Sequence, residues 1–481
     1  MFTLKLLPVA LAVALAGCAN DHGLAPNGKL SEAKDLGAAA SLVPVTVSPA
    51  AWPSATWWTG LGDRQLDALI DEALRDSPDL QVAAARAHQA MAVADQYDAD
   101  RAPYIGADAN VSRSRLSKVQ DPLLEGGRYS TLRTAEVTFD YTLDLWGGER
   151  AAWEAALGQA RAAQVDRQAA RLTLAVDVAR AYSDLGHAFI AADLADEDLK
   201  RTRQLLDLGR QRLAAGIDSQ YQLQQTESLE ASAEEQAVNA GKQLRSARIA
   251  LAVLLGKGPE RAGEIARPQI LKPAAVELPS QLPADLLGRR PDLVAARWRV
   301  EAASRNIDVS KTRFYPNLNL TAAAGTQAML GDALFGAPSR FFNIAPAVSL
   351  PLFDGGRLRA GLDASDADYE LAVAQYNKTL VAALGSVADA INRLDALGRQ
   401  VAAKQHAVDV ARQSYDTVTQ RYGSGIGNYL DVLTIEQQLL ATQQQLANLT
   451  AERIDVSIQL MQALGGGYQG DALASAQAPR E

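Results

Sequence analysis

An internal repeat constrains the fold of this 481-residue chain more than any other feature of its sequence. Pro78-Asp79-Leu80 recurs as Pro291-Asp292-Leu293, about 210 residues later, and three glycine-containing markers follow at nearly the same offset. These markers are Gly147-Gly148 with Gly355-Gly356, Gly216 with Gly425, and Leu255-Gly256 with Leu464-Gly465. The shared order predicts a tandem duplication over residues 61–256 and 280–466, joined by a Pro-rich linker over 257–279.

Both copies predict the same succession of elements. A first helix ends at Pro103 or Pro316, because proline cannot continue a helix and disfavours the helical conformation of the residue before it. Two short stretches with strand periodicity follow. The double glycine then precedes a long helix, Glu149 to Leu213 or Arg357 to Tyr422, which at roughly 1.5 Å per residue is on the order of 100 Å long. A turn and a shorter second helix complete each copy.

The helical segments carry the 3/4 spacing of coiled coils. In the first long helix this spacing is kept by Val165, Ala169, Leu172, Val176 and Ala179. Many of the core positions are small, so these helices can pack closely with knobs-into-holes contacts. An ordinary four-helix bundle is the alternative that this pattern alone leaves open.

The strand-like segments alternate strictly between polar and apolar residues. Residues 134–145 do so without exception, and 105–112, 317–322 and 343–352 show the same period. Alternation over roughly 9–11 residues is typical of a transmembrane β-strand with one lipid face and one aqueous face. A half-buried sheet of a soluble protein would look the same strand by strand.

Four strands cannot close a barrel by themselves. A bilayer tolerates no open sheet edge, because unpaired backbone groups in hydrocarbon cost several kcal/mol each. If these strands enter a membrane, several copies of the chain must therefore share one barrel. Two copies would supply eight strands and three would supply twelve, and the sequence physics does not choose between them.

The N-terminus predicts a lipid anchor. Residues 1–17 form a candidate lipoprotein signal peptide, whose apolar run is too short for a span of roughly 20 residues. Cys18 follows Leu-Ala-Gly as in the bacterial lipobox, so it is the predicted lipidation site of an anchored segment over 18–60; an ordinary cleaved signal is the alternative. Ala19, where retention signals of the inner membrane place Asp, favours the outer membrane. Residues 467–481 are expected to form a C-terminal tail, and we predict no transmembrane helix.

Composition argues against several other functions. The formal net charge of −9 disfavours a nucleic-acid partner, and the single Cys excludes a disulfide framework and a zinc cluster. The four His have no metal-ligand spacing, so we predict no metal and no cofactor. An enzyme such as a hydrolase is disfavoured because the chain lacks GxSxG, HExxH, a P-loop and a GxGxxG between strand and helix. We predict no catalytic residues.

Several motifs together resemble one family. They are the lipobox with Cys18, Trp57-Trp58-Thr59-Gly60-Leu61-Gly62-Asp63, Gly288-Arg289-Arg290-Pro291-Asp292-Leu293, Leu352-Phe353-Asp354-Gly355-Gly356-Arg357 and Arg421-Tyr422-Gly423-Ser424-Gly425. Over nearly the whole mature chain the sequence is similar to the TolC-like outer-membrane factors, in particular the OprM/NodT-type efflux lipoproteins. The resemblance implies an α+β membrane protein. In this fold a homotrimer forms a 12-stranded β-barrel, with four strands from each chain, continued by a coiled-coil α-helical barrel.

The resemblance also implies a gate where the two helices of each hairpin turn. Leu430 fits the apolar ring of this gate. The next two gate positions, which form ion pairs in OprM-like relatives, fall on Thr434 and Gln437, so an ion-pair lock is not expected. Asp431 has two interpretations: a ring of carboxylates that favours cations, or a cap of the helix that restarts after the turn.

The expected function is a passive exit duct for small toxic compounds, in the outer membrane of a Gram-negative bacterium. Its implied partners are a periplasmic adaptor, an inner-membrane pump and outer-membrane lipid. The adaptor is expected to dock at the hairpin tips, near Gly216, Arg421 and Gly425. The alternative is a periplasmic lipoprotein with structural or adaptor duties and no membrane pore.

Overall fold

The computed structural model describes residues 25–31, 52–115, 117, 119, 129–269, 288–329 and 331–469. The predicted signal peptide and Cys18 lie outside these residues, as do parts of the anchored segment, the linker and the tail.

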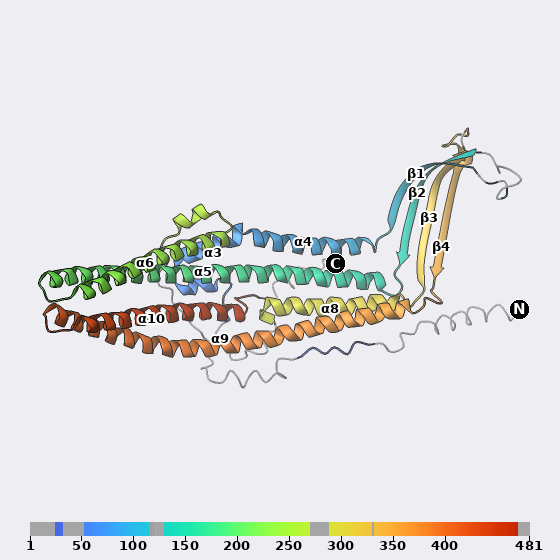
Figure 1. Ribbon diagram of the computed structural model, residues 1–481. Helices are drawn as coiled ribbons and strands as arrows, with labels where there is room; N and C mark the ends of the chain where they lie inside the picture. Colours follow the sequence, from blue (N-terminus) through green and yellow to red (C-terminus); the bar gives the residue numbers. More distant parts are fainter. Residues whose placement is uncertain are drawn as a thin grey trace. The chain divides into compact units, whose positions relative to one another are not determined.

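The two halves of the chain have the same order of elements (Figure 1). The first half contains α4 (Pro78–Ala99), β1 (Tyr104–Arg115), β2 (Tyr129–Leu143), α5 (Gly148–Ala214) and α6 (Gln220–Leu254). The second contains α8 (Pro291–Thr312), β3 (Asn317–Met329), β4 (Arg340–Ser349), α9 (Arg357–Gly423) and α10 (Tyr429–Ala463). The long helices α5 and α9 both have 67 residues, and their partners α6 and α10 both have 35. The predicted tandem repeat of helices and strands is confirmed.

Three 3-10 helices and one further α-helix complete the described elements. They are η2 (Trp57–Leu61), α3 (Arg64–Asp76), η3 (Pro259–Glu264) and η4 (Ala337–Ser339). No helix of the described ranges combines the length and the apolar character that a membrane span needs.

In both halves, a glycine and an aspartate lie in the turn that connects a strand to the long helix. Gly147 has φ +74° and Gly355 has φ +66°, a left-handed conformation that side chains rarely adopt. Asp144 Oδ2 accepts a hydrogen bond from the Arg150 backbone N–H at 2.9 Å. In the second half Asp354 accepts one from the Leu358 N–H at 2.7 Å. The carboxylates thus satisfy N–H groups that the first helical turn leaves without an intrahelical partner.

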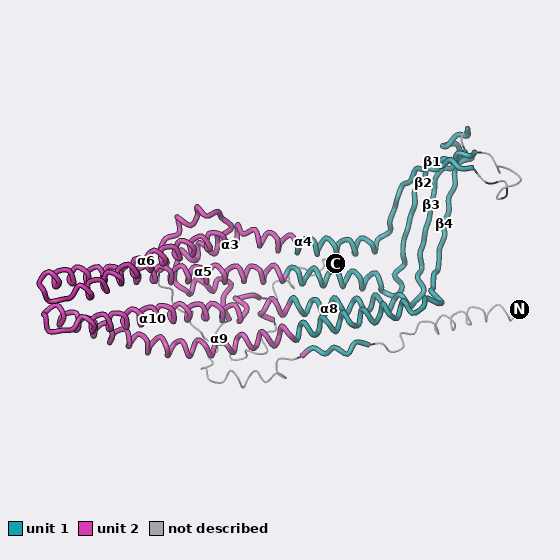
Figure 2. The backbone as a smooth tube through the Cα atoms, viewed as in Figure 1, with its two compact units in different colours: residues 1–30, 86–164, 295–377 teal, residues 31–85, 165–294, 378–481 magenta. Residues whose placement is uncertain are grey.

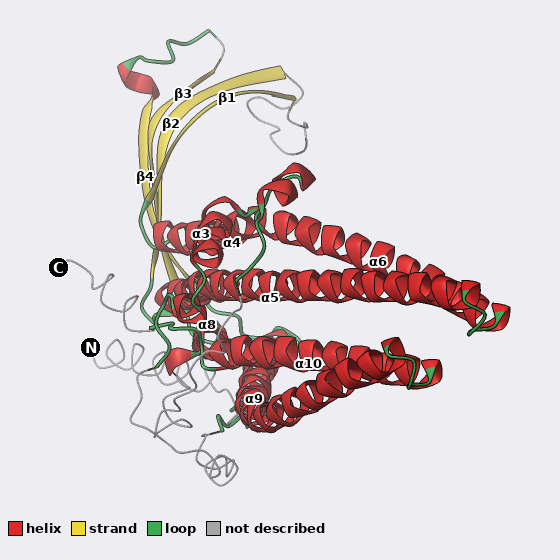
Figure 3. Cartoon of the chain, turned by 90° about the vertical axis from the view of Figure 1, so that its left-hand side faces the viewer, coloured by secondary structure: helices red, strands yellow, loops and turns green. Residues whose placement is uncertain are grey.

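The four strands form one curved antiparallel sheet in the order β1-β2-β3-β4 (Figure 3). The register places apolar side chains together on one face: Ile105 opposite Phe139, Leu320 opposite Pro346, and Ala322 opposite Ile344. The other face carries polar pairs such as Asp108 with Glu136 and Thr142 with Asn319. The predicted two-faced strands are confirmed.

The strand limits differ from the predicted ones for local reasons. β2 begins at Tyr129 and pairs along its whole length, although Thr131 and Arg133 interrupt the apolar face that the sequence pattern relies on. β4 ends at Ser349 rather than at residue 352, before Pro351. Proline has no backbone N–H to donate to a sheet ladder.

The chain divides into two compact units (Figure 2). Residues 1–30, 86–164 and 295–377 form the unit with the sheet, and residues 31–85, 165–294 and 378–481 form the unit with both helical hairpin ends. In the sheet unit, buried Ala94 and Ala160 form a thin core, and a Cβ on Gly158 would stand 3.0 Å from that of Ala302. Such small residues let α5 and α8 approach closely.

The second unit has a thicker apolar core. η2 and α3 pack there against α5, α6 and α10, through Trp57, Leu66, Ile70, Tyr182, Leu251 and Ile458. Asp63 caps α3 by accepting from the Gln65 N–H at 2.9 Å, and its other oxygen accepts from the buried Tyr182 hydroxyl at 2.6 Å. This bond joins the N-terminal segment to the long helix.

Candidate functional site

The polar face of the sheet carries only acidic charge. All the carboxylates of the strands, Asp108, Glu136 and Asp140, share the face whose other residues are mainly Asn, Thr, Ser and Ala. Asp108 and Glu136 are directly opposite each other across β1 and β2. Like charges in such a pair destabilise a sheet unless water screens them. This face is therefore suited to line a water-filled space, and the apolar face to meet lipid.

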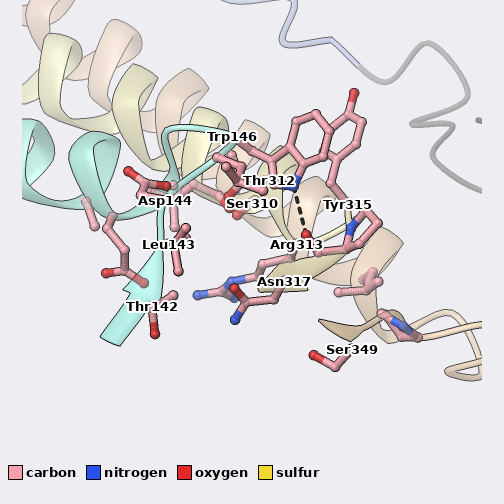
Figure 4. A pocket seen from close by; sticks show the side chains of 18 of the residues that line it. Thr142, Leu143, Asp144, Trp146, Ser310, Thr312, Arg313, Tyr315, Asn317 and Ser349 are labelled. Atoms are coloured by element: carbon pink, nitrogen blue, oxygen red, sulfur yellow. Dashed lines mark hydrogen bonds between the residues drawn. The ribbon is translucent and has the colours of Figure 1, made fainter. Parts of the chain in front are cut away.

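An aromatic pair stands where the strands pass into the helices (Figure 4). The rings of Trp146 and Tyr315 stack with centroids 4.8 Å apart, and Trp146 Nε1 donates a hydrogen bond to the Pro316 carbonyl at 2.8 Å. They border a pocket of about 520 Å³. Its polar lining includes Thr142, Asp144, Ser310, Arg313, Asn317 and Ser349. Apolar rings with a satisfied polar end are the side chains that membrane interfaces favour.

The α5–α6 hairpin turns at Gly216. Its φ of +73° lets the Ile217 N–H return to the Arg212 carbonyl at 2.9 Å, which closes the end of α5. Ser219 then caps α6 in a reciprocal capping box with Gln222. The predicted tip residue Gly216 therefore lies in the turn between α5 and α6.

The α9–α10 hairpin turns at Gly425, where φ is +78°. The Ile426 N–H donates to the carbonyl of Arg421 in the last turn of α9, at 3.1 Å. Asn428 caps α10 by accepting from the Leu430 N–H at 3.1 Å. The interpretation of Asp431 as the cap is therefore wrong: Asp431 lies in the first turn, with an exposed side chain.

Polar contacts join the two hairpin tips. The Tyr422 hydroxyl donates to Asp218 Oδ2 at 3.1 Å. Arg212 forms an ion pair with the same carboxylate at 3.0 Å, and its guanidinium carbon lies 4.4 Å from the centre of the Tyr422 ring. Next to this triad, the hydroxyls of Tyr429 and Thr226 share a hydrogen bond. Burial and the Asp218 charge raise the pKa of Tyr422 to about 12, so its hydroxyl stays protonated and able to donate.

A buried carboxyl lies next to the tip contacts. Glu436 on α10 is 5% exposed, and its Oε1 lies 3.4 Å from the Arg201 guanidinium of α5. Burial raises the pKa of Glu436 to about 7, against the opposing effect of the Arg201 charge, and the Asp198 carboxylate raises it further. Burial also raises the pKa of Tyr415 on α9, which faces this carboxyl. Glu436 can therefore change its charge near neutral pH.

The predicted gate residues share an exposed surface of α10. Leu430 is 54% exposed, whereas Tyr429, Val432 and Leu433 are buried against the hairpins. Asp431, Thr434 and Gln437 are exposed as well. The spacing of positions 430, 434 and 437 places them along one side of the helix.

The sequence did not indicate the residues that join the tips. Tyr422, Tyr429 and Glu436 were not predicted to have a role, although the repeat contains a usable signal. At the positions of the two tyrosines the first copy has Leu213 and Gln220. A large side chain with a polar end therefore occurs in one copy only, and this difference marks where the two copies meet.

Comparison with known proteins identifies the family. The sequence profile of the outer membrane efflux protein family matches residues 69–257 and 282–466. The chain belongs to the outer membrane efflux protein family. It is thus a subunit of an efflux channel of the outer membrane, and its family is one of transport channels. The TolC-like fold is confirmed, with a barrel of twelve strands from three chains.

Individual relatives agree with this assignment. The chain is 39% identical to the fusaric acid resistance protein FusA of Burkholderia cepacia, over 76% of this chain and 69% of FusA. It is 32% identical to the multidrug resistance outer membrane protein MdtP of Escherichia coli (strain K12), over 88% of this chain and 89% of MdtP. The crystal structure of the outer membrane protein VceC from Vibrio cholerae matches with a TM-score of 0.81 and 36% identity, and covers 87% of this chain and all of VceC.

Proposed function

We infer that three copies of the chain form a passive exit duct for small toxic compounds, which a periplasmic adaptor and an inner-membrane pump supply. The acidic polar face of the sheet supports a water-filled path, and the names of FusA and MdtP point to toxic compounds as cargo. The duct itself performs no chemistry. This function is favoured over a periplasmic lipoprotein without a pore by membership in a family of efflux channels.

The observation that carries the gate is the position of Leu430. Its side chain is half exposed in the first turn of α10, whereas the neighbouring Tyr429, Val432 and Leu433 are buried. A leucine turned away from its own hairpins is free to meet the same leucine of two other copies around a common axis. The carboxylate of Asp431 would then form a ring beside it, which favours cations over anions. Thr434 and Gln437 continue this surface with uncharged side chains, so the gate closes without an ion-pair lock.

The gate is tested by Leu430→Ala, with single-channel conductance in planar bilayers as the readout. Removal of three leucine side chains should widen the closed tip and raise conductance. Tyr221→Ala is the matched control, because Tyr221 stands at the corresponding position of α6 and is 73% exposed. Equal conductance of wild type and Leu430→Ala, or the same increase in Tyr221→Ala, would exclude Leu430 as the constriction.

The hairpin tips are the proposed docking surface for the adaptor. Arg421 and the turn glycines Gly216 and Gly425 lie beside two exposed apolar side chains, Ile217 at 62% and Ile426 at 73%. Their side chains give the hairpin tips an apolar surface that an adaptor can cover. Substitution of both isoleucines by Asp should abolish co-purification with the adaptor while trimers still form. Retained co-purification would locate docking elsewhere.

A further inference from the structure

The basic residues of the sheet are segregated from its acidic ones. The strands carry four arginines, Arg113 and Arg115 on β1, Arg133 on β2 and Arg340 on β4. The register places all of them on the apolar face, since Arg133 is opposite Val111 and Arg340 is opposite Thr326, which shares a face with Ala324 and Ala322 by alternation. The face that meets lipid therefore carries positive charge, and the opposite face carries only carboxylates.

These arginines all lie toward one end of the sheet. β1 ends at Arg115 and β4 begins at Arg340, whereas the long helices follow the other ends of β2 and β4. In the outer-membrane channel the helices extend into the periplasm, so the arginine end lies at the outer leaflet. An arginine on the lipid face is unfavourable at the middle of a bilayer and tolerated near its surface. The position of these residues fits the level of the lipid headgroups.

Two of the arginines form cation–π contacts with the same aromatic ring. The guanidinium carbons of Arg113 and Arg115 lie 5.2 Å and 5.6 Å from the centre of the Tyr129 ring, which is 67% exposed. Arg133, by contrast, donates to the backbone carbonyls of Met329 and Asp332 and is used to hold the loop after β3. The side chains of Arg113, Arg115 and Arg340 are exposed.

Closure of the barrel brings these exposed arginines together. β1 and β4 are the two edges of the sheet of one chain, so a barrel of three chains must pair β1 of one copy with β4 of the next. In an antiparallel pair of these edges, the outer end of β1 meets the outer end of β4. We call this junction between β1 of one copy and β4 of the next a seam. Each seam then contains Arg113 and Arg115 of one copy and Arg340 of its neighbour. The trimer has three such seams.

We propose that each seam binds a phosphate group of the phosphorylated glycolipid in the outer leaflet, the lipid A portion of lipopolysaccharide. Planar guanidinium groups match phosphate oxygens with paired hydrogen bonds, and a lipid headgroup places its phosphates at the level where these side chains lie. Each site consists of residues from two copies. Lipid binding would thus hold neighbouring copies together at the edge where their sheets meet.

The test measures binding of lipid A to the purified trimer in detergent by native mass spectrometry. Wild type should bind up to three bisphosphorylated lipid A molecules per trimer. Arg113→Gln with Arg340→Gln should weaken this binding about 25-fold, or about fivefold for each arginine. Arg399→Gln on α9, an exposed arginine paired with Asp395, is the control and should bind as wild type does.

Several results would overturn the proposal. Equal binding of dephosphorylated lipid A would exclude phosphate recognition, and equal weakening by Arg399→Gln would indicate a general effect of charge. Competition by the same concentration of inorganic pyrophosphate would indicate a free-anion site rather than a lipid site. If the double variant does not assemble, wild type with the two forms of lipid A and Arg113→Gln alone still decide the question.

Discussion

The buried Glu436 should make closure of the hairpin tips depend on pH. Its pKa rises from 4.5 in water to about 7 when the tip is closed, mainly because burial penalises the charged carboxylate. This difference corresponds to about 3 kcal/mol between the two protonation states. The closed tip is therefore stabilised fully below pH 4.5, loses this contribution as the pH rises toward 7, and lacks it above. From pH 5 to pH 8 we expect a loss of about 2 kcal/mol.

Glu436→Gln should remove this pH dependence. The neutral amide resembles the protonated carboxyl, so the tip of the variant should stay closed across the whole range. The assay is hydrogen–deuterium exchange of the peptide over residues 429–439 at pH 5 and pH 8, corrected for the intrinsic rate at each pH. A loss of about 2 kcal/mol corresponds to roughly 30-fold faster exchange in wild type at pH 8, if exchange proceeds through opening of the tip.

The repeat supplies a matched control for this experiment. Glu227 stands at the position of α6 that corresponds to Glu436 in α10, and its side chain is exposed. Glu227→Gln should therefore keep the pH response of wild type. The reasoning is refuted if Glu436→Gln also keeps that response, or if wild type exchanges equally at both values of pH after correction.

Three further predictions concern the tips and the sheet. Tyr422→Phe removes the hydrogen bond to the Asp218 carboxylate and should weaken the contact between the tips by about 1.5–3 kcal/mol. Single-channel recording should then show a higher conductance, and an unchanged conductance would contradict this prediction. Gly427→Ala should lower the thermal stability of the tip because its Cβ would stand 2.7 Å from the backbone nitrogen of Tyr422, whereas Gly423→Ala meets no neighbouring atom within 4 Å and should not. Glu136→Gln removes three carboxylates from the barrel lumen and should reduce cation preference, measured as a smaller reversal potential in a salt gradient.

Most of the fold was predictable because its signals are local. Pro103 and Pro316 exclude a continued helix, and α4 and α8 end shortly before them, at Ala99 and Thr312. The strict alternation over residues 134–145 requires a sheet with two different faces. The sequence pattern does not predict the outer end of β2, because Thr131 and Arg133 stand where an apolar residue is expected. Hydrogen bonding to the neighbouring strand, rather than side-chain character, extends β2 there.

The cap of α10 shows where local signals become ambiguous. Asn428 and Asp431 are both residue types that cap helices, and only three positions separate them. The choice depends on a tertiary contact: Gly427 packs against the backbone of Tyr422, so closely that the chain can enter the helix only after it. Sequence periodicity does not reveal that contact, so the sequence alone leaves two interpretations of Asp431.

The two ends of the helical unit differ in the contacts that stabilise them. The core near α3 contains large, fully buried apolar side chains such as Ile70 and Leu251. The contact between the tips combines buried Val432 and Leu433 with the polar Tyr422, Asp218 and the titratable Glu436. Exposure of a fully buried aliphatic side chain costs about 1.5–3 kcal/mol at any pH, whereas the contribution of the buried Glu436 carboxyl decreases as the pH rises toward 7. We therefore expect the proposed opening motion to take place at the tips, where a change of pH removes part of the stability, while the core near α3 stays packed.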